Sequence, residues 1–367
     1  MSGVRAPNAC RDCLRRSWLL ARLSASLDYR CGDVARLTEA LTLDDEQLLD
    51  ALAGTRRAAL RSELLRFDPG DVPQALTSER LCRHETGYPA SLRDVGAPPM
   101  LHIRGARTRL RDLTSAPAVA VMGSARATDH GLEVARSLAR GLTASGVTVV
   151  AGVADGIALA AHSGVLDVGG GGIAVVGRGL DVASPRRQRS VIERLSGTGC
   201  AVSELPGDCD GRRWGPVAAE RTVVRLAELT VVVEADGSAR ELAGAHLARA
   251  LGRRLAAVPG RVSSRASHGT NALLIDGARL VRGPEDVLEL LGADRTAGPR
   301  LARAPCARLE PRLAEVLERV GEGRDSIDQL SGSDEDPGDV LLALSELELM
   351  GLLARGDGGR YLPRGVA

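Results

Sequence analysis

Glycine and serine residues end several short apolar runs in the middle third of the sequence, each just before a helical pattern. The run VAVM ends in Gly123 and Ser124, and the run TVVA ends in Gly152, with Gly156 opening the next helix. Glycine lets a backbone approach a ligand closely, and the free N–H groups of a helix N-terminus attract anions. These positions predict a site for a dinucleotide, a small phosphate or a nucleic-acid backbone.

Alternating strands and helices are expected to position this site. Short β-branched runs separated by helical segments indicate βαβ units and a mainly parallel sheet with helices on both faces, which is a doubly wound α/β fold. Ligands bind at the carboxyl ends of the strands in such a sheet. The expected strands are 119–123, 147–152, 172–177, 200–204, 229–235, 255–260 and 278–281, and the expected helices are 130–145, 156–166, 187–196, 217–228, 240–251 and 271–276.

Composition changes along the chain predict five segments. The first is helical, because apolar residues recur at three-to-four spacing, and the last contains three helices and a hairpin, which suggests a winged helix. The predicted segments are a helical (SAM-like) module at 1–70, a connecting extension at 71–117, the α/β core at 118–295, a linker at 296–308 and a winged-helix domain at 309–367.

Composition narrows the class of protein. The 367 residues carry a net charge of +1, and all basic residues are arginine. A balanced charge gives no global field for nucleic acid, and 2% aromatic residues leave few platforms for stacking bases. No apolar run reaches membrane-spanning length and the N-terminus lacks the apolar core of a secretion signal, so we expect a cytoplasmic protein with no membrane partner.

Seven scattered cysteines argue against a disulfide framework. Cys10 and Cys13 form a C-x-x-C pair, but a zinc site needs four ligands and no second close pair follows. The sequence therefore predicts reduced thiols at a helix start, with neither a metal nor a cofactor.

Two phosphate-binding motifs fit poorly. The loop after the first core strand reads G-S-A-R-A-T rather than G-x-G-x-x-G, and Gly152 stands where an acidic residue would bind the ribose of a dinucleotide. A Walker A loop is excluded because the chain contains no lysine. A small phosphate and a nucleic-acid backbone both stay open as ligands at this point.

An ordered set of blocks resembles the DNA-processing protein A family (DprA, also called Smf). The blocks are GYPASLRDVGAPPMLHIRG, VAVMGSARAT, GVTVVAGVADGIALAAH, IAVVGRGLDVASP, VSELPG, VVVEADGS and AVPGRVSSRASHGTNALLIDGA. The resemblance covers roughly residues 85–290 and implies an extended Rossmann fold. It further implies a non-enzymatic protein of natural transformation that binds and protects single-stranded DNA, dimerises and promotes loading of a RecA-type recombinase.

The resemblance and the strand-end positions together predict a nucleic-acid-binding set. Backbone amides and arginines would hold phosphates, with no catalytic residue. The predicted residues are Gly123, Ser124, Arg126, Gly152, Gly156, Arg221, Gly237, Ser238, Thr270 and Asn271. Helix capping is the alternative role for Thr270 and Asn271.

Several positions depart from the family pattern. Ala125 occupies the usual arginine position, Asp155 replaces a basic residue, and Ala219-Glu220 precede Arg221 in place of Arg-Asn. Each lost phosphate contact removes about 0.7 from the salt slope on single strands. We therefore expect weaker DNA binding or a shifted path, with Arg126, Arg178, Arg186, Arg187 and Arg221 compensating in part.

Two other functions stay open. A nucleotide phosphoribohydrolase with a similar sheet would use a catalytic glutamate in a PGGxGTxxE block; Glu241 is present here, but the PGG run is not. A scaffold that has lost DNA affinity is the second.

His162 is expected to pack in a helix. The strongly acidic segment 332–351 of the winged helix favours protein contacts over duplex binding.

Overall fold

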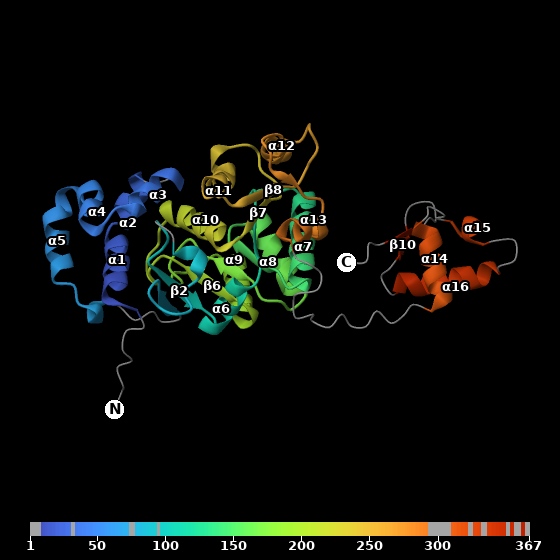
Figure 1. The fold of residues 1–367 in the computed structure, drawn as a ribbon, viewed down its shortest axis with the longest axis horizontal. Helices are drawn as coiled ribbons and strands as arrows, with labels where there is room; N and C mark the ends of the chain where they lie inside the picture. The colour runs from blue at the N-terminus through green and yellow to red at the C-terminus, as the bar shows by residue number, and fades with distance from the viewer. Residues whose placement is uncertain are drawn as a thin grey trace, which may run out of the picture. The chain divides into compact units, whose positions relative to one another are not determined.

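The computed structural model describes residues 9–30, 34–72, 78–93, 96–292, 310–321, 326–331, 336–349, 353–355 and 361–363 (Figure 1). Its contacts divide the chain into two compact units, Met1–Pro299 and Arg300–Ala367. The predicted linker at 296–308 lies outside the described residues. In the part of the chain that is described, no helix is long and apolar enough to cross a membrane.

A nine-stranded sheet forms the centre of the first unit, in the order β1-β2-β6-β5-β4-β3-β7-β8-β9. Seven strands, β3 to β9, run parallel to one another, while β2 pairs antiparallel with both β6 and the edge strand β1. The strands are β1 (Glu79–Cys82), β2 (Met100–Arg104), β3 (Ala118–Met122), β4 (Thr148–Gly152), β5 (Ile173–Val175), β6 (Cys200–Ser203), β7 (Leu229–Val232), β8 (Arg254–Ala257) and β9 (Arg279–Leu280).

Helices cover both faces of this sheet. Buried residues of α7, α8, α9 and α13 pack on one face, and those of α6, α10, α11 and α12 pack on the other. The helices are α6 (Arg107–Ser115), α7 (Asp129–Ala144), α8 (Ile157–Asp167), α9 (Arg186–Thr198), α10 (Trp214–Leu226), α11 (Ala239–Ala250), α12 (His268–Ile275) and α13 (Pro284–Leu291). The predicted doubly wound α/β fold is confirmed, with every expected core strand and helix present.

The N-terminal helices pack on the α/β core. Their leucines share one apolar cluster with Leu205, Trp214 and Ala218, and Asp28 accepts hydrogen bonds from the backbone N–H groups of Arg213 and Trp214. The helical segment therefore belongs to the same compact unit as the sheet. Its helices are α1 (Arg11–Arg22), α2 (Ser24–Arg30), α3 (Val34–Thr42), α4 (Asp45–Leu52) and α5 (Arg57–Leu65).

The segment expected to be a connecting extension supplies β1 and β2, which sequence patterning did not predict as strands. The second unit contains α14 (Pro311–Gly321), α15 (Ile327–Leu330) and α16 (Pro337–Leu349), followed by β10 (Leu353–Arg355) paired antiparallel with β11 (Tyr361–Pro363). Three helices followed by a two-stranded sheet have the arrangement of a winged helix, and their apolar residues form a separate core.

Candidate nucleic-acid interface

Ser124 joins the loops that follow three parallel strands. Its backbone N–H donates to the carbonyl of Glu234 at 2.7 Å, and its hydroxyl donates to Oε1 of Glu241 at 2.7 Å. Its carbonyl accepts from the N–H of Ile157, the first residue of α8, at 3.1 Å. The side chain is buried. Ser124 therefore fixes the loop after β3 to its neighbours and does not itself face solvent.

Glu234 holds the other end of this loop. Its carboxylate accepts from the N–H of Thr128 at 2.9 Å and from the Thr128 hydroxyl at 2.6 Å. The same hydroxyl accepts from the N–H of Gly131 and so caps α7. A Cβ at Gly131 would lie 2.3 Å from the Glu234 carboxyl carbon, so only glycine fits beside this carboxylate. Residues 124–128 are consequently anchored at both ends.

Gly156 brings the loop after β4 against the loop after β3. Its φ is +79°, and a Cβ there would lie 2.2 Å from the carbonyl oxygen of Ser124. Gly152, at the end of β4, is half-buried, and its carbonyl accepts from Nε2 of His162 at 2.9 Å. The two predicted glycines thus shape the contact between these loops.

Gly237 and Ser238 form the loop between β7 and α11. Both are exposed, and the Ser238 hydroxyl caps α11 by accepting from the N–H of Glu241 at 3.4 Å. Glu241 in turn accepts from the N–H of Asp236 at 2.7 Å while it accepts from Ser124. One carboxylate therefore links the loops after β3 and β7.

Arg126 lies at the exposed centre of the anchored loop 124–128. Its backbone N–H donates to the Ser124 hydroxyl, and its guanidinium has no partner among the residues that the structure describes. Arg186 and Arg187 open α9, are exposed and likewise have no side-chain partner within the described ranges. Arg178 donates to the carbonyl of Ala183. Arg126, Arg186 and Arg187 are thus available to an anionic ligand.

A groove of about 780 Å³ runs between α7, α8 and α9 beside these strand ends. Cations and carboxylates both face it, and one cation, Arg136, is paired with Asp167. The charged residues lining it are Asp129, Glu133, Arg136, Asp155, Arg186 and Arg187, and Gly156 lies at its edge. The acidic residues are expected to weaken phosphate binding on this face.

Arg221 is not part of this surface, contrary to the sequence prediction. It is 1% exposed on α10 and forms a bidentate pair with Glu204, with Nε 3.0 Å from Oε1 and Nη2 hydrogen-bonded to Oε2. Its Nη1 also donates to the carbonyl of Gly96. Because every arm of the guanidinium is directed to an internal acceptor, Arg221 cannot contact DNA in this fold.

Thr270 and Asn271 also have internal partners. Thr270 is fully buried and its hydroxyl donates to the carbonyl of Ser267 at 3.2 Å. The Asn271 side chain makes paired hydrogen bonds of 3.1 Å with the backbone N–H and carbonyl of Gly260. Neither residue is the N-cap of α12, which is Ser267. Both therefore shape the loop after β8, and neither a phosphate contact nor a capping role fits their positions.

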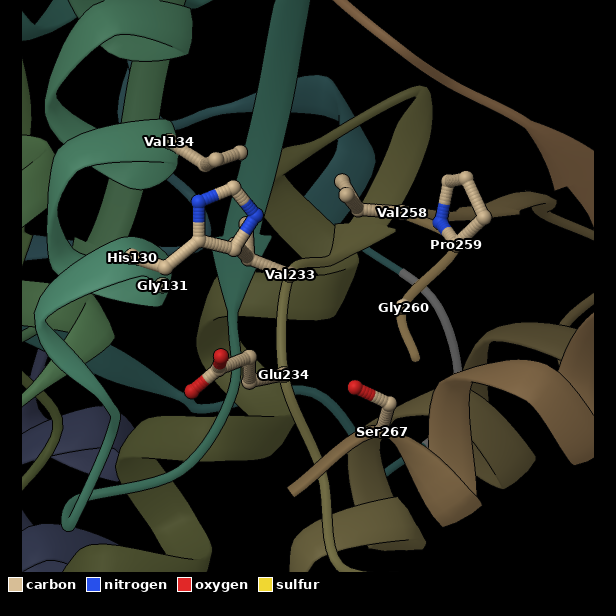
Figure 2. Close-up of a pocket in the computed structure, with 9 residues that line it drawn as sticks. All are labelled: His130, Gly131, Val134, Val233, Glu234, Val258, Pro259, Gly260 and Ser267. Atoms are coloured by element: carbon tan, nitrogen blue, oxygen red, sulfur yellow. The ribbon is translucent and has the colours of Figure 1, made fainter. Parts of the chain in front are cut away.

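A small pocket lies where β7 and β8 end, and Figure 2 shows the residues that line it, from α7, these two strand ends and the turn before α12. They include His130, Glu234, Pro259 and Ser267. Its volume of about 10 Å³ is enough for a single water molecule. A base or a sugar is too large to enter it.

Two ionisable side chains, His162 in α8 and Glu220 in α10, have shifted pKa values. Burial lowers the pKa of His162 to about 4, although its hydrogen bonds to the carbonyls of Gly152 and Ala151 act in the opposite direction. His162 is therefore neutral and packs in α8, as expected. Burial raises the pKa of Glu220 to about 7, and its carboxylate accepts from the N–H of Gly244 at 2.7 Å. Glu220 thus joins α10 to α11.

A second cluster lies apart from the strand ends. Cys10 and Cys13 meet Cys82 and His84, and the four potential ligand atoms lie within 4.8 Å of one another. The C-x-x-C pair is therefore not isolated in the fold. Cys82 and His84, which lie beside it, come from far along the chain, in β1 and the turn that follows.

The chain belongs to a family of DNA-processing proteins. The profile of the family described as DNA recombination-mediator protein A matches residues 79–292. The putative DNA processing protein DprA of Mycobacterium tuberculosis is 36% identical, over 74% of this chain and 71% of the relative. Protein Smf of a Synechocystis strain is 28% identical, over 87% of each chain. The predicted family resemblance is confirmed.

Solved structures agree. DNA processing protein A from Streptococcus pneumoniae superposes with a TM-score of 0.60 at 25% identity, covering 75% of this chain and 97% of that one. DNA processing protein A from Helicobacter pylori superposes with a TM-score of 0.51 at 25% identity, covering 58% of this chain and 95% of that one. That structure was reported for its single-stranded DNA binding mode. The Rossmann-like core is thus shared with proteins of this family.

Proposed function

We propose that this protein binds the backbone of single-stranded DNA across the loops that follow β3, β4 and β7. The observation that carries the proposal is the exposed guanidinium of Arg126, which has no partner among the described residues and lies on a loop anchored at both ends by Ser124 and Thr128. A preformed loop loses little conformational freedom when a phosphate binds. The single-stranded DNA binding described for the Helicobacter pylori relative supports the choice of ligand.

Arg186 and Arg187 extend the proposed interface along the groove to the start of α9. Backbone amides near Gly123, Gly156, Gly237 and Ser238 would supplement these three cations. Asp155 stands at the N-terminus of α8, where it competes with a phosphate for the helix dipole. Affinity is therefore expected to be lower than three unopposed cations would give.

The finer part of the proposal concerns partners. The protein would act in DNA uptake without catalysis, as a homodimer that protects the strand and presents it to a RecA-type recombinase in the cytoplasm. The family description as a recombination mediator supports this role. In the second unit, α16 exposes Leu341, Leu342, Asp339 and Glu348. An acidic and apolar surface suits a protein partner better than duplex DNA.

The competing phosphoribohydrolase function finds less support in the site. The Glu241 carboxylate already accepts from Ser124 and Asp236, and the pocket beside Glu234 has room for only one water molecule. Release of ribose phosphate from a nucleoside monophosphate is the assay for this activity. A turnover that Glu241→Gln abolishes would replace the DNA-binding proposal with an enzymatic one.

Fluorescence anisotropy with a labelled poly-dT strand and a matched duplex, over a salt series, tests the proposal. Strand-selective binding that weakens steeply with salt is the expected result. Absence of binding to either probe at low salt would overturn the proposal and favour a scaffold that works through protein contacts alone.

A further inference from the structure

We propose that Cys10, Cys13, Cys82 and His84 form a structural zinc site that fastens α1 to the antiparallel edge of the sheet. Three thiol sulfurs and one imidazole nitrogen make up a Cys₃His ligand set, which is typical of closed, four-coordinate zinc sites. Nothing in the family relationship or in the strand-end interface requires this cluster.

The distances suit a tetrahedral ion. Zinc bonds of about 2.3 Å to sulfur and about 2.0–2.1 Å to nitrogen place neighbouring ligand atoms about 3.6–3.8 Å apart. The Sγ atoms of Cys10 and Cys13 lie 3.2 and 3.5 Å from Nδ1 of His84. All four ligand atoms lie within 4.8 Å of one another, so shifts of about 1 Å or less would complete the coordination.

Local structure holds each pair of ligands in place without an ion. Cys10 is the N-cap of α1 and Cys13 lies in its first turn, so the helix presents both sulfurs on one side. On the partner element, the N–H of Cys82 donates to the Glu85 carboxylate at 3.0 Å, and the N–H of Glu85 donates to the Cys82 carbonyl at 3.0 Å. The Cys82–Glu85 turn is thereby preorganised.

The surroundings match a structural rather than a catalytic site. Cys13 and Cys82 are 3% and 1% exposed and pack with Leu14, Phe67 and Met100 in a small apolar cluster. His84 is exposed, which leaves a route for the ion. Because all four positions are protein ligands, no open position remains for a substrate. The ion would instead cross-link segments about 70 residues apart.

Metal content and Co²⁺ spectroscopy of the full chain test the site. Protein purified under reducing conditions should contain about one Zn²⁺ per chain, and Co²⁺ replacing it should give the intense visible bands of a tetrahedral thiolate site. Cys82→Ser and His84→Ala should each reduce zinc content at least about fivefold. Cys209→Ser removes a buried cysteine elsewhere and serves as the matched control, with zinc content unchanged.

Thermal unfolding of the unaltered chain, with and without zinc, tests the site without relying on variants that could fail to fold. Zinc removal by a chelator should lower the Tm of the unaltered chain by about 5 °C or more, and added Zn²⁺ should restore it. The proposal is overturned if reduced protein neither contains zinc nor produces a tetrahedral Co²⁺ spectrum. It is likewise overturned if thiol counting shows a Cys10–Cys13 disulfide in protein that has never been exposed to oxidant.

Discussion

Two carboxylate networks in the same sheet, one after β6 and the other after β7, serve different purposes. Glu204, which follows β6, forms a buried ion pair with the guanidinium of Arg221. Glu234 follows β7 and Glu241 lies in α11. Their carboxylates accept hydrogen bonds from hydroxyl and backbone N–H groups of the neighbouring loops. The first network uses its arginine inside the protein. The second shapes loops and leaves Arg126 directed to solvent.

The comparison shows why an arginine's position in a sequence motif is a poor guide to its role. Arg126 and Arg221 were both predicted to bind nucleic acid, yet only Arg126 is exposed. The difference is that Arg221 has a buried carboxylate, that of Glu204, within hydrogen-bonding distance. The variants below test whether these two roles are distinct, from the largest expected effect to the smallest.

Arg221→Met should give the largest loss of stability. Removing one partner of a buried ion pair leaves Glu204 charged and unpaired, which costs about 3–5 kcal/mol. The free energy of unfolding, measured by urea denaturation, should fall by this amount. Arg57→Ala, which breaks an exposed pair with Asp50, is the control and should change stability by about 1 kcal/mol or less.

A further substitution refines this test. Pairing Arg221→Met with Glu204→Leu removes both charges, so much of the lost stability should return. If the double variant were as unstable as Arg221→Met alone, the unpaired Glu204 charge would not be the cause.

Gly156→Ala should disturb the loop contact as well as the backbone. Gly156 and Gly146 have almost the same φ, +79° and +80°, but only a Cβ at Gly156 would strike Ser124. Gly146→Ala should therefore cost about 1–2 kcal/mol of stability with DNA affinity unchanged. Gly156→Ala should cost more and also weaken single-strand binding about fivefold or more, or roughly 1 kcal/mol. Equal effects of the two variants on affinity would contradict the proposed role of the loop.

Glu220→Gln should change how stability depends on pH. Burial raises the folded-state pKa of Glu220 to about 7 from 4.5, so the folded protein binds more protons than the unfolded chain between these values. The unaltered protein should therefore lose stability as pH rises through this window, by on the order of 1–3 kcal/mol relative to Glu220→Gln. Urea denaturation of both proteins at pH 5 and pH 8 measures the difference, and parallel pH profiles would show that Glu220 does not titrate in this range.

Much of the fold followed from local pattern, and less of the site did. The parallel strands from β3 to β9 are short β-branched runs between amphipathic helices, so periodicity predicted them. The strands Glu79–Cys82 and Met100–Arg104 were missed because neither is a run of β-branched residues: two of the four residues of the first are charged, and the second reads MLHIR. Charged residues are tolerated in Glu79–Cys82 because it is the edge strand.

The site depended on contacts that no local pattern encodes. The Glu204 partner of Arg221 lies 17 residues away, on another element, and the Gly260 partner of Asn271 lies across a loop. The cluster of Cys10, Cys13, Cys82 and His84 was not predicted for the same reason. Its two pairs of residues meet only when β1 packs beside the start of α1. Glycine and serine at strand ends marked the positions of these loops, but the partners of Ser124 and Gly156 lie on other loops and were not predictable from local pattern.

The salt dependence of single-strand binding by an arginine triple variant tests the central claim most directly. Arg126, Arg186 and Arg187, changed together to alanine, should lower the slope of log affinity against log salt by about 2, at about 0.7 for each phosphate contact. The control changes the equally exposed but paired Arg57, Arg61 and Arg282 and so removes the same net charge. The account predicts an unaltered slope for this control. Equal losses of slope in the two triple variants would show that binding follows net charge alone and would contradict an interface at the strand-end loops.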